Sequence, residues 1–142
     1  MITVRHLLEK KGHDIVSIGP TATVYDAIKK MADLNIGSLV VMDGTNIIGM
    51  ITERHYAREV ILKGKASSDT LVKEIMELDV VYARLEHSVE ECMVEMTNKA
   101  VRHLPVRENE CLVGVVSIGD LVRSIIDDQK NTIEQLERYI GS

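Results

Sequence analysis

The 142-residue sequence contains no tryptophan and no phenylalanine, and tyrosine occurs only four times. Proteins that bind single-stranded nucleic acid without sequence preference stack bases on aromatic side chains, so this class is disfavoured. The formal net charge of −5 also argues against nucleic acid, because contact with the phosphate backbone needs a basic surface. No apolar run approaches the roughly 20 residues that cross a bilayer. We therefore expect neither nucleic acid nor a membrane as a partner.

Cysteine and proline are equally rare, with two of each. Two cysteines, Cys92 and Cys111, are too few for a disulfide scaffold, which predicts free thiols and a cytoplasmic location. The histidines and cysteines never show the spacing of metal ligands. The sequence also lacks a nucleophile elbow and a glycine-rich phosphate loop. These absences predict no metal and no enzymatic activity, whereas the 45% hydrophobic content is sufficient for a packed core.

The sequence contains an internal duplication. A shift that places Gly49 on Gly114 aligns "DIVSIGPTATVYDAIKKMADLNIGSLVVMDGTNIIGMITERHYAR" with "DVVYARLEHSVEECMVEMTNKAVRHLPVRENECLVGVVSIGDLVR" without a gap. Repeated self-similarity of this kind indicates two copies of one supersecondary unit. The identical pairs in the alignment are Asp14/Asp79, Val16/Val81, Val24/Val89, Met31/Met96, Leu39/Leu104, Val41/Val106, Gly49/Gly114 and Arg58/Arg123.

Each copy is predicted to fold in the order β-α-β-β-α. An apolar strand (15–18; 80–83) leads to a capped helix, a hairpin and a final helix. We predict an α+β fold in which the two repeats pack as a pseudo-twofold pair, since one copy alone could not bury its apolar face. The predicted domains are a first repeat over residues 1–62, a linker over 63–69, a second repeat over 70–127 and a C-terminal helix over 128–142.

The stretch "GVVSIGDL" carries the main candidate site, at the turn from a strand to the last helix of the second copy. A Ser-x-x-Asp sequence at such a turn caps the free N–H groups of the helix, and capping alone would explain Ser117 and Asp120. The same residues also suit a ribose, because a carboxylate accepts hydrogen bonds from two neighbouring hydroxyl groups. The free N–H groups of such a turn suit a phosphate close by.

The chain is similar to the CBS (cystathionine beta-synthase) domain family, and it resembles a free-standing tandem CBS pair. The resemblance covers about residues 1 to 126 and rests mainly on "RHLPV" and "GVVSIGD", with "GMITERHYAR" close to the second of these. It implies clefts between the copies, dimerisation of two pairs, and binding of adenine nucleosides and nucleotides, among them AMP, ADP, ATP, NAD(H) and S-adenosylmethionine. It further implies a regulatory protein without catalytic activity.

The resemblance also implies which residues hold the nucleotide. Ser117 and Asp120 contact the ribose, Arg102 contacts phosphate, and a first strand sandwiches adenine. His103 could reach phosphate beside Arg102, although a histidine at a strand start is as often structural. The first strand, which would contact adenine, contributes Val80, Val81 and Tyr82. Further nucleotide-binding residues are expected next to Arg102 and His103: Val101, Leu104 and Pro105.

The first copy departs from this pattern. His55 replaces the carboxylate of Asp120, and Gly37 replaces Arg102, so a ribose would lack its main acceptor there. Thr52, Arg54 and Arg58 could still neutralise phosphate, or the arginines could lie on a solvated helix face. We expect one well-formed site on the second copy, and a second site that is weaker or differs in ligand.

The C-terminal segment "NTIEQLERYIGS" places Ile133, Leu136 and Ile140 on one helical face. This face could cover its own pair or a dimer partner, and the second alternative is favoured. The function predicted from the sequence is an adenine-nucleotide sensor, with AMP first and NADH or ATP next, that acts as a homodimer on an unknown partner protein. The alternative is a dimerisation scaffold without nucleotide. An enzyme is disfavoured, since only His55 or His103 could serve as its base.

Overall fold

The computed structural model describes residues 1–141 and divides the chain into two compact units. The first-repeat unit consists of Ile15–Val80. The second-repeat unit combines residues 1–14 with the chain from Val81 onward. The predicted repeat bounds describe the duplication in the sequence and stay a prediction. The compact units differ from them, because the N-terminal segment 1–14 belongs to the unit of the second repeat.

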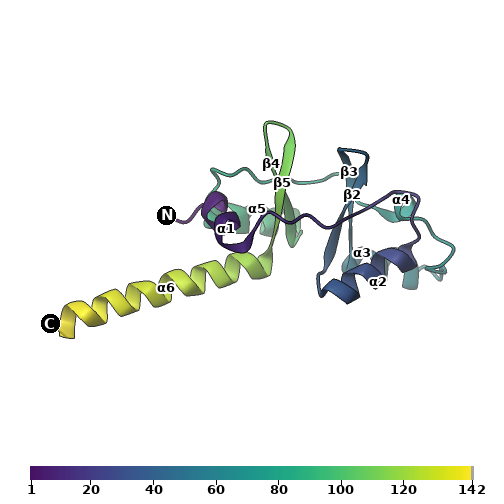
Figure 1. The fold of residues 1–142 in the computed structure, drawn as a ribbon. Helices are drawn as coiled ribbons and strands as arrows, with labels where there is room; N and C mark the ends of the chain where they lie inside the picture. The colour runs from purple at the N-terminus through teal and green to yellow at the C-terminus, as the bar shows by residue number, and fades with distance from the viewer. Residues whose placement is uncertain (142) are drawn as a thin grey trace. The chain divides into compact units, whose positions relative to one another are not determined.

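The second-repeat unit contains a two-stranded antiparallel sheet and three helices (Figure 1). Ser88 caps α5 by accepting the Glu91 N–H at 3.0 Å, as the Ser-x-x-Glu sequence predicts. The turn between the strands places Asn109 and Glu110 at positive φ. The elements are α1 (Val4–Lys11), α5 (Val89–Lys99), β4 (His103–Glu108), β5 (Cys111–Ser117) and α6 (Ile118–Gly141).

The first-repeat unit contains a three-stranded sheet in the order β1-β2-β3, with β1 parallel and β3 antiparallel to β2. Thr23 caps α2 through the Asp26 N–H at 3.1 Å. The last helix of the repeat is a short α-turn that continues as a π-turn. The elements are β1 (Ser17–Ile18), α2 (Val24–Leu34), β2 (Ser38–Asp43), β3 (Asn46–Thr52), α3 (Glu53–Tyr56), η1 (Ala57–Ile61) and α4 (Val72–Ile75).

The two repeats exchange their leading segments. Thr3, which precedes α1, forms a β-bridge with Ser88 of the second repeat. Leu71, which precedes α4, forms the matching bridge with Thr23 of the first repeat. Each leading helix therefore completes the core of the other repeat, and this explains why the second-repeat unit begins with the N-terminus of the chain.

Two glycines that the duplication aligns permit this exchange. A Cβ on Gly114 would lie 2.9 Å from Leu8 Cδ2, and a Cβ on Gly49 would lie 2.8 Å from the Glu77 carbonyl oxygen and 2.9 Å from Met76 Sδ. All three distances are shorter than a Cβ atom tolerates in van der Waals contact. The leading segments thus approach β3 and β5 so closely that a Cβ at either position would force a neighbour to shift.

Each unit has an apolar core of its own. In the second-repeat unit the buried side chains include Val4 and Leu8 of α1, Leu104 and Val106 of β4, and Leu121 of α6. In the first-repeat unit the buried side chains come mainly from α2, β2, β3 and α4. They are Val24, Ala27, Met31, Leu39, Val41, Ile51, Val60, Val72 and Ile75. The α+β architecture predicted from the sequence is confirmed.

One detail of the predicted secondary structure is wrong. Residues 80–83 form no strand, because only Ala83 reaches β4: its N–H donates to the Pro105 carbonyl oxygen at 2.9 Å, and its own carbonyl accepts the Arg107 N–H at 3.0 Å. The predicted C-terminal helix is present as the end of α6, which continues without a break from Ile118. Its predicted last residue, Ser142, lies outside the described residues.

Candidate functional site

The last helix of the second repeat begins with a reciprocal cap between Ser117 and Asp120. The Asp120 N–H donates to Ser117 Oγ at 3.2 Å, and the Ser117 N–H donates to Asp120 Oδ2 at 2.8 Å. This is the capping box, which satisfies two backbone donors at once. The structural role considered for the Ser-x-x-Asp sequence is therefore present.

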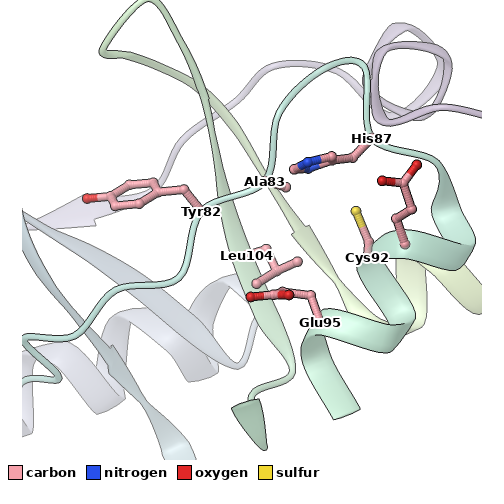
Figure 2. A pocket seen from close by; sticks show the side chains of 7 residues that line it. Tyr82, Ala83, His87, Cys92, Glu95 and Leu104 are labelled. Carbon is pink, nitrogen blue, oxygen red and sulfur yellow. The ribbon is translucent and has the colours of Figure 1, made fainter. Parts of the chain in front are cut away.

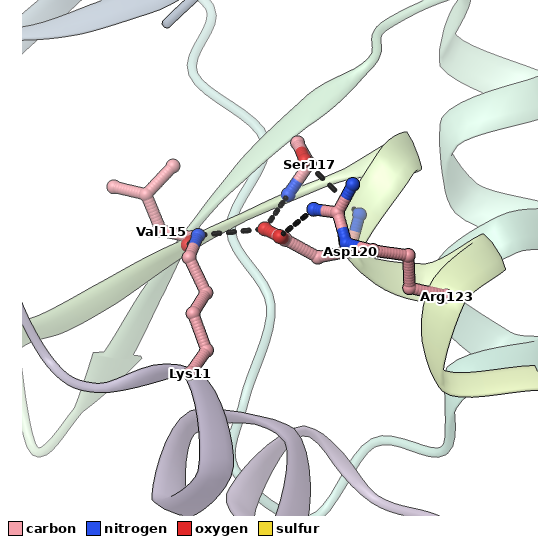
Figure 3. A network of polar contacts seen from close by, with 5 residues as sticks. All are labelled: Lys11, Val115, Ser117, Asp120 and Arg123. Carbon is pink, nitrogen blue, oxygen red and sulfur yellow. Dashed lines mark hydrogen bonds and ion pairs between the residues drawn. The ribbon is translucent and has the colours of Figure 1, made fainter. Parts of the chain in front are cut away.

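Two cations also hold the Asp120 carboxylate (Figure 3). Lys11 Nζ lies 2.6 Å from Oδ2 and also donates to the Val115 carbonyl oxygen at 2.6 Å. The Arg123 guanidinium lies 2.7 Å from Oδ1. Asp120 exposes only 9% of its side chain, whereas Arg123 exposes 70%. The inner ion pair joins the end of α1 to the start of α6, and the outer pair lies in solvent.

These contacts lower the pKa of Asp120 despite its burial. Burial raises the pKa of the carboxyl group, but the hydrogen bonds from Lys11 and Ser117 outweigh it and the net direction is downward. Asp120 is consequently an anion at neutral pH, which is the form that accepts hydrogen bonds from a diol.

The start of β4 lies beside this cap. His103 pairs with Ser117 across the hairpin, and the Ile118 N–H donates to the Arg102 carbonyl oxygen at 2.9 Å. Burial lowers the pKa of His103, and the neighbouring Asp120 only partly opposes this effect. The structure thus brings the backbone of Arg102 close to His103, Ser117 and Asp120, and Arg102 is exposed whereas His103 is half-buried.

The remaining predicted residues of the second repeat differ in their surroundings. Leu104 and Pro105 are buried in β4, and Val101 packs against the core. Val81 packs against this core as well, while Val80 ends the first-repeat unit. Tyr82 is half-buried, and Arg107 lies over its ring at 3.7 Å from the centroid, which is a cation–π contact.

A small pocket opens beside Tyr82 within the second-repeat unit (Figure 2). Its volume is about 190 Å³, and its walls are the segment before α5, the first turns of α5, and Leu104. The lining residues include Tyr82 and Leu104, but neither Ser117 nor Asp120. Burial, together with Glu91 and Glu95, raises the pKa of the Cys92 thiol in its wall to about 11, so this thiol stays protonated.

The equivalent turn of the first repeat has the opposite charge pattern. Thr52 caps α3 by accepting the backbone N–H of His55 at 3.1 Å, and its hydroxyl oxygen also lies 3.3 Å from Nδ1 of the His55 imidazole. Nε2 of this imidazole lies 3.3 Å from Glu77 Oε2. Where the second repeat places an anion against Lys11, the first repeat places an imidazole against a carboxylate. Arg54 and Arg58 are exposed on the helix that follows. The turn therefore has an imidazole, and not a carboxylate, at the position that the duplication aligns with Asp120.

Sequence reasoning missed the partners that complete both turns: Lys11, Arg123 and Glu77. Lys11 lies far from Asp120 in the chain and carries no motif, and Glu77 likewise lies far from His55 and belongs to no motif. The spacing of Arg123 three residues after Asp120 on one helix is a signal that could have identified this pair.

Within residues 1–141 no group of three or more histidine, cysteine and acidic side chains is arranged to hold a metal ion. Among the described helices, none combines the length and the hydropathy of a membrane span. The candidate site is therefore defined by the polar contacts and the pocket given above.

Comparison with known proteins identifies the family. The CBS domain model matches residues 4–61 and 72–127. The chain is 38% identical over 123 residues to an Arabidopsis thaliana protein named CBS domain-containing protein CBSX3, mitochondrial, covering 83% of this chain and 60% of that protein. It is 36% identical over 112 residues to an uncharacterized 17.7 kDa protein of Acidianus ambivalens, covering 78% and 66%. The chain thus spans less than two thirds of the length of these two relatives.

Solved structures of CBS proteins have closely similar folds. A protein with CBS domains from Burkholderia ambifaria is 46% identical, with a TM-score of 0.87 and coverage of 89% of this chain and 96% of that one. A CBS-domain protein from Agrobacterium tumefaciens is 35% identical, with a TM-score of 0.83 and coverage of 86% and 98%. Tandem CBS modules generally serve regulation and signal transduction. The chain belongs to the CBS-domain family and carries two CBS domains in tandem.

Proposed function

We propose that the second-repeat unit binds an adenine nucleotide, with AMP as the first candidate and NADH or ATP next, and that the protein acts as a homodimeric regulatory module on a partner protein. One observation carries this proposal. The anionic Asp120, its cap partner Ser117 and the exposed residue Arg102 lie at one end of the β4–β5 hairpin. The family, in which adenine nucleotides are the usual ligands, supports the choice of ligand.

Asp120 supplies the chemistry that a ribose requires. A carboxylate has about four acceptor positions, and in this structure Lys11, Ser117 and Arg123 occupy three of them. The ribose hydroxyl groups would use the remaining position and displace the exposed Arg123 from Oδ1. Arg102 then faces the phosphate as a charge-assisted donor, and His103 stays neutral beside it.

Adenine is assigned to the stretch from Val80 to Tyr82, following the family resemblance. Arg107 covers one face of the Tyr82 ring, which leaves the other face and the half-buried Val81 for contact with a base. The first-repeat turn is proposed to bind such a ligand weakly or not at all, because His55 already pairs with Glu77 and cannot accept both hydroxyl groups of a diol. The predicted cytoplasmic location stays a prediction.

The scaffold alternative also has an observation in its favour. Side chains and backbone of the protein itself already supply three hydrogen bonds to the Asp120 carboxylate, and the reciprocal cap is complete. Under this alternative the CBS pair serves dimerisation only, and replacement of Asp120 costs about 1 kcal/mol of helix-cap stability without any effect on a ligand.

Isothermal titration calorimetry separates the two candidates. Wild type, Asp120→Ala and the matched variant His55→Ala are each titrated with AMP, ATP, NADH and S-adenosylmethionine. Micromolar binding of one ligand that is lost in Asp120→Ala and kept in His55→Ala supports the nucleotide sensor. Absence of heat from all four ligands with folded wild-type protein supports the scaffold.

A further inference from the structure

The exposed side of α6 carries an apolar stripe that the core of the unit does not use. The inward face of this helix presents Ile118, Leu121 and Ile125 to the second-repeat core. Beyond these residues α6 extends away from the rest of its unit (Figure 1), and every residue from 128 to 141 is exposed. An isolated helix segment of this length is only marginally stable in water. The extension therefore needs a packing partner.

The stripe has the spacing of a coiled-coil seam. Its members follow one another at alternating steps of four and three residues: Val122, Ile126, Gln129, Ile133, Leu136 and Ile140. This is the a/d pattern of the heptad repeat, and the slight mismatch with 3.6 residues per turn is what makes two helices supercoil. The apolar members are 40% to 82% exposed. A seam of this kind is complementary to another copy of itself.

The residue types at these positions select the number and direction of the helices. Isoleucine occupies all three a positions (Ile126, Ile133 and Ile140), and Leu136 occupies a d position. β-Branched residues at a with leucine at d favour two parallel strands. The single polar member, Gln129, lies in the middle of the seam. In a parallel pair in register its amide meets the same amide of the second copy and can hydrogen-bond with it.

An antiparallel pair that overlaps along the whole seam would instead place Gln129 against Ile133 of the second copy. The amide would then be buried without a hydrogen-bond partner, which is costly. A parallel pair in register avoids this cost. The flanking positions Lys130 and Glu137 do not bring like charges together in that arrangement, because their cross-helix neighbours are Ile125 and Thr132.

We propose that α6 pairs with α6 of a second copy as a parallel, in-register, two-stranded coiled coil over residues 122–140. The occupant of the stripe is thus the same chain. This seam specifies which interface the homodimer uses and in which direction the two chains run. It does not depend on nucleotide binding at Asp120, so the two proposals can fail separately.

Disulfide cross-linking of the full chain tests the seam. Gln129→Cys and the matched variant Asn131→Cys, which lies on the opposite face of α6, are compared in a Cys111→Ser background under mild oxidation. We expect a disulfide-linked dimer from Gln129→Cys that forms at least tenfold faster than from Asn131→Cys. Equal rates, or no cross-linking at position 129, would overturn the proposal.

A second pair of variants shows that cross-linking depends on the stripe. Ile133→Ser with Ile140→Ser should slow disulfide formation at position 129 at least tenfold, whereas Asn131→Ser with Arg138→Ser should leave it unchanged. All four positions are exposed, so thermal unfolding of the CBS core should stay within a few degrees of wild type. An unchanged rate in the isoleucine variant with an intact core would contradict the assignment.

Discussion

The ammonium group of Lys11 lies 2.6 Å from Asp120 Oδ2, although 109 residues separate the two in the sequence. This ion pair links the N-terminal helix to the candidate site of the second repeat. It exists only because the leading segments are exchanged between the repeats, since α1 otherwise would have packed on the repeat that directly follows it.

The low pKa of Asp120 predicts a pH dependence of stability. The folded state holds the pKa of this carboxyl group below its unfolded value, so its contribution is fully present above the unfolded pKa of about 4 and is lost as the pH falls through the folded pKa. Asp120→Asn should therefore unfold at a lower temperature than wild type at pH 6, and the difference should shrink below about pH 4. Thermal unfolding followed by circular dichroism from pH 3 to pH 7 measures it.

Asp128→Asn provides the control for this prediction, because Asp128 lies exposed on the same helix. It should leave the pH dependence of the midpoint close to that of wild type. A difference between Asp120→Asn and wild type that persists unchanged at about pH 3 would mean that lost packing, and not the charge, causes the destabilisation.

The two aligned glycines should respond differently to a methyl group. Gly114→Ala meets the flexible end of Leu8, so we expect a loss of about 1 to 3 kcal/mol that Leu8→Ala partly relieves in the double variant. Gly49→Ala meets the backbone carbonyl of Glu77, which no side-chain substitution relieves. Urea unfolding of the single and double variants measures these costs, and additivity of Gly114→Ala with Leu8→Ala would contradict the contact.

The two cysteines should differ in reactivity. Burial raises the pKa of Cys92 to about 11, whereas Cys111 is exposed at the β4–β5 turn. Ellman's reagent at about pH 8 should modify Cys111 rapidly in the native protein. It should modify Cys92 only after unfolding, because the thiolate is the reactive form. Cys111→Ser should remove the fast reaction. A fast reaction that survives in this variant would show that the pocket around Cys92 opens readily.

Arg123 should compete with the ribose for Asp120. Its guanidinium occupies Oδ1, and the ion pair is exposed, which limits its strength to about 0.2 to 1 kcal/mol. Arg123→Gln should thus strengthen AMP binding by about two- to fivefold in calorimetry, with Arg138→Gln, farther along the same helix, as the unaffected control. Weaker binding in Arg123→Gln would indicate that this arginine contacts the ligand directly.

Patterns that depend on neighbouring residues could be predicted from the sequence. The capped helices at Thr23 and Ser88 and the hairpins that follow them carry local signals, and the structure contains them. The unbroken α6 was predictable as well, because no proline interrupts the segment from Ile118 to Ile140 and its only glycine is in the first turn.

Features that depend on tertiary partners could not be predicted in this way. The apolar stretch 80–83 satisfies the pattern of a strand, but only Ala83 finds a partner in β4. The duplication likewise does not reveal which repeat receives α1. In the sequence, Lys11 is therefore not distinguishable from other charged helix residues, and only the exchange of the leading segments explains its ion pair with Asp120.

The measurement that tests the central claim most directly compares AMP with 2′-deoxy-AMP, titrated into wild type and Asp120→Asn. If Asp120 holds the ribose diol, removal of one hydroxyl group should weaken binding to wild type by about 10- to 100-fold, as expected for a hydrogen bond to a charged group. The two ligands should bind Asp120→Asn with nearly equal affinity. Equal affinity of the two ligands for wild type would contradict the account and leave Asp120 as a helix cap.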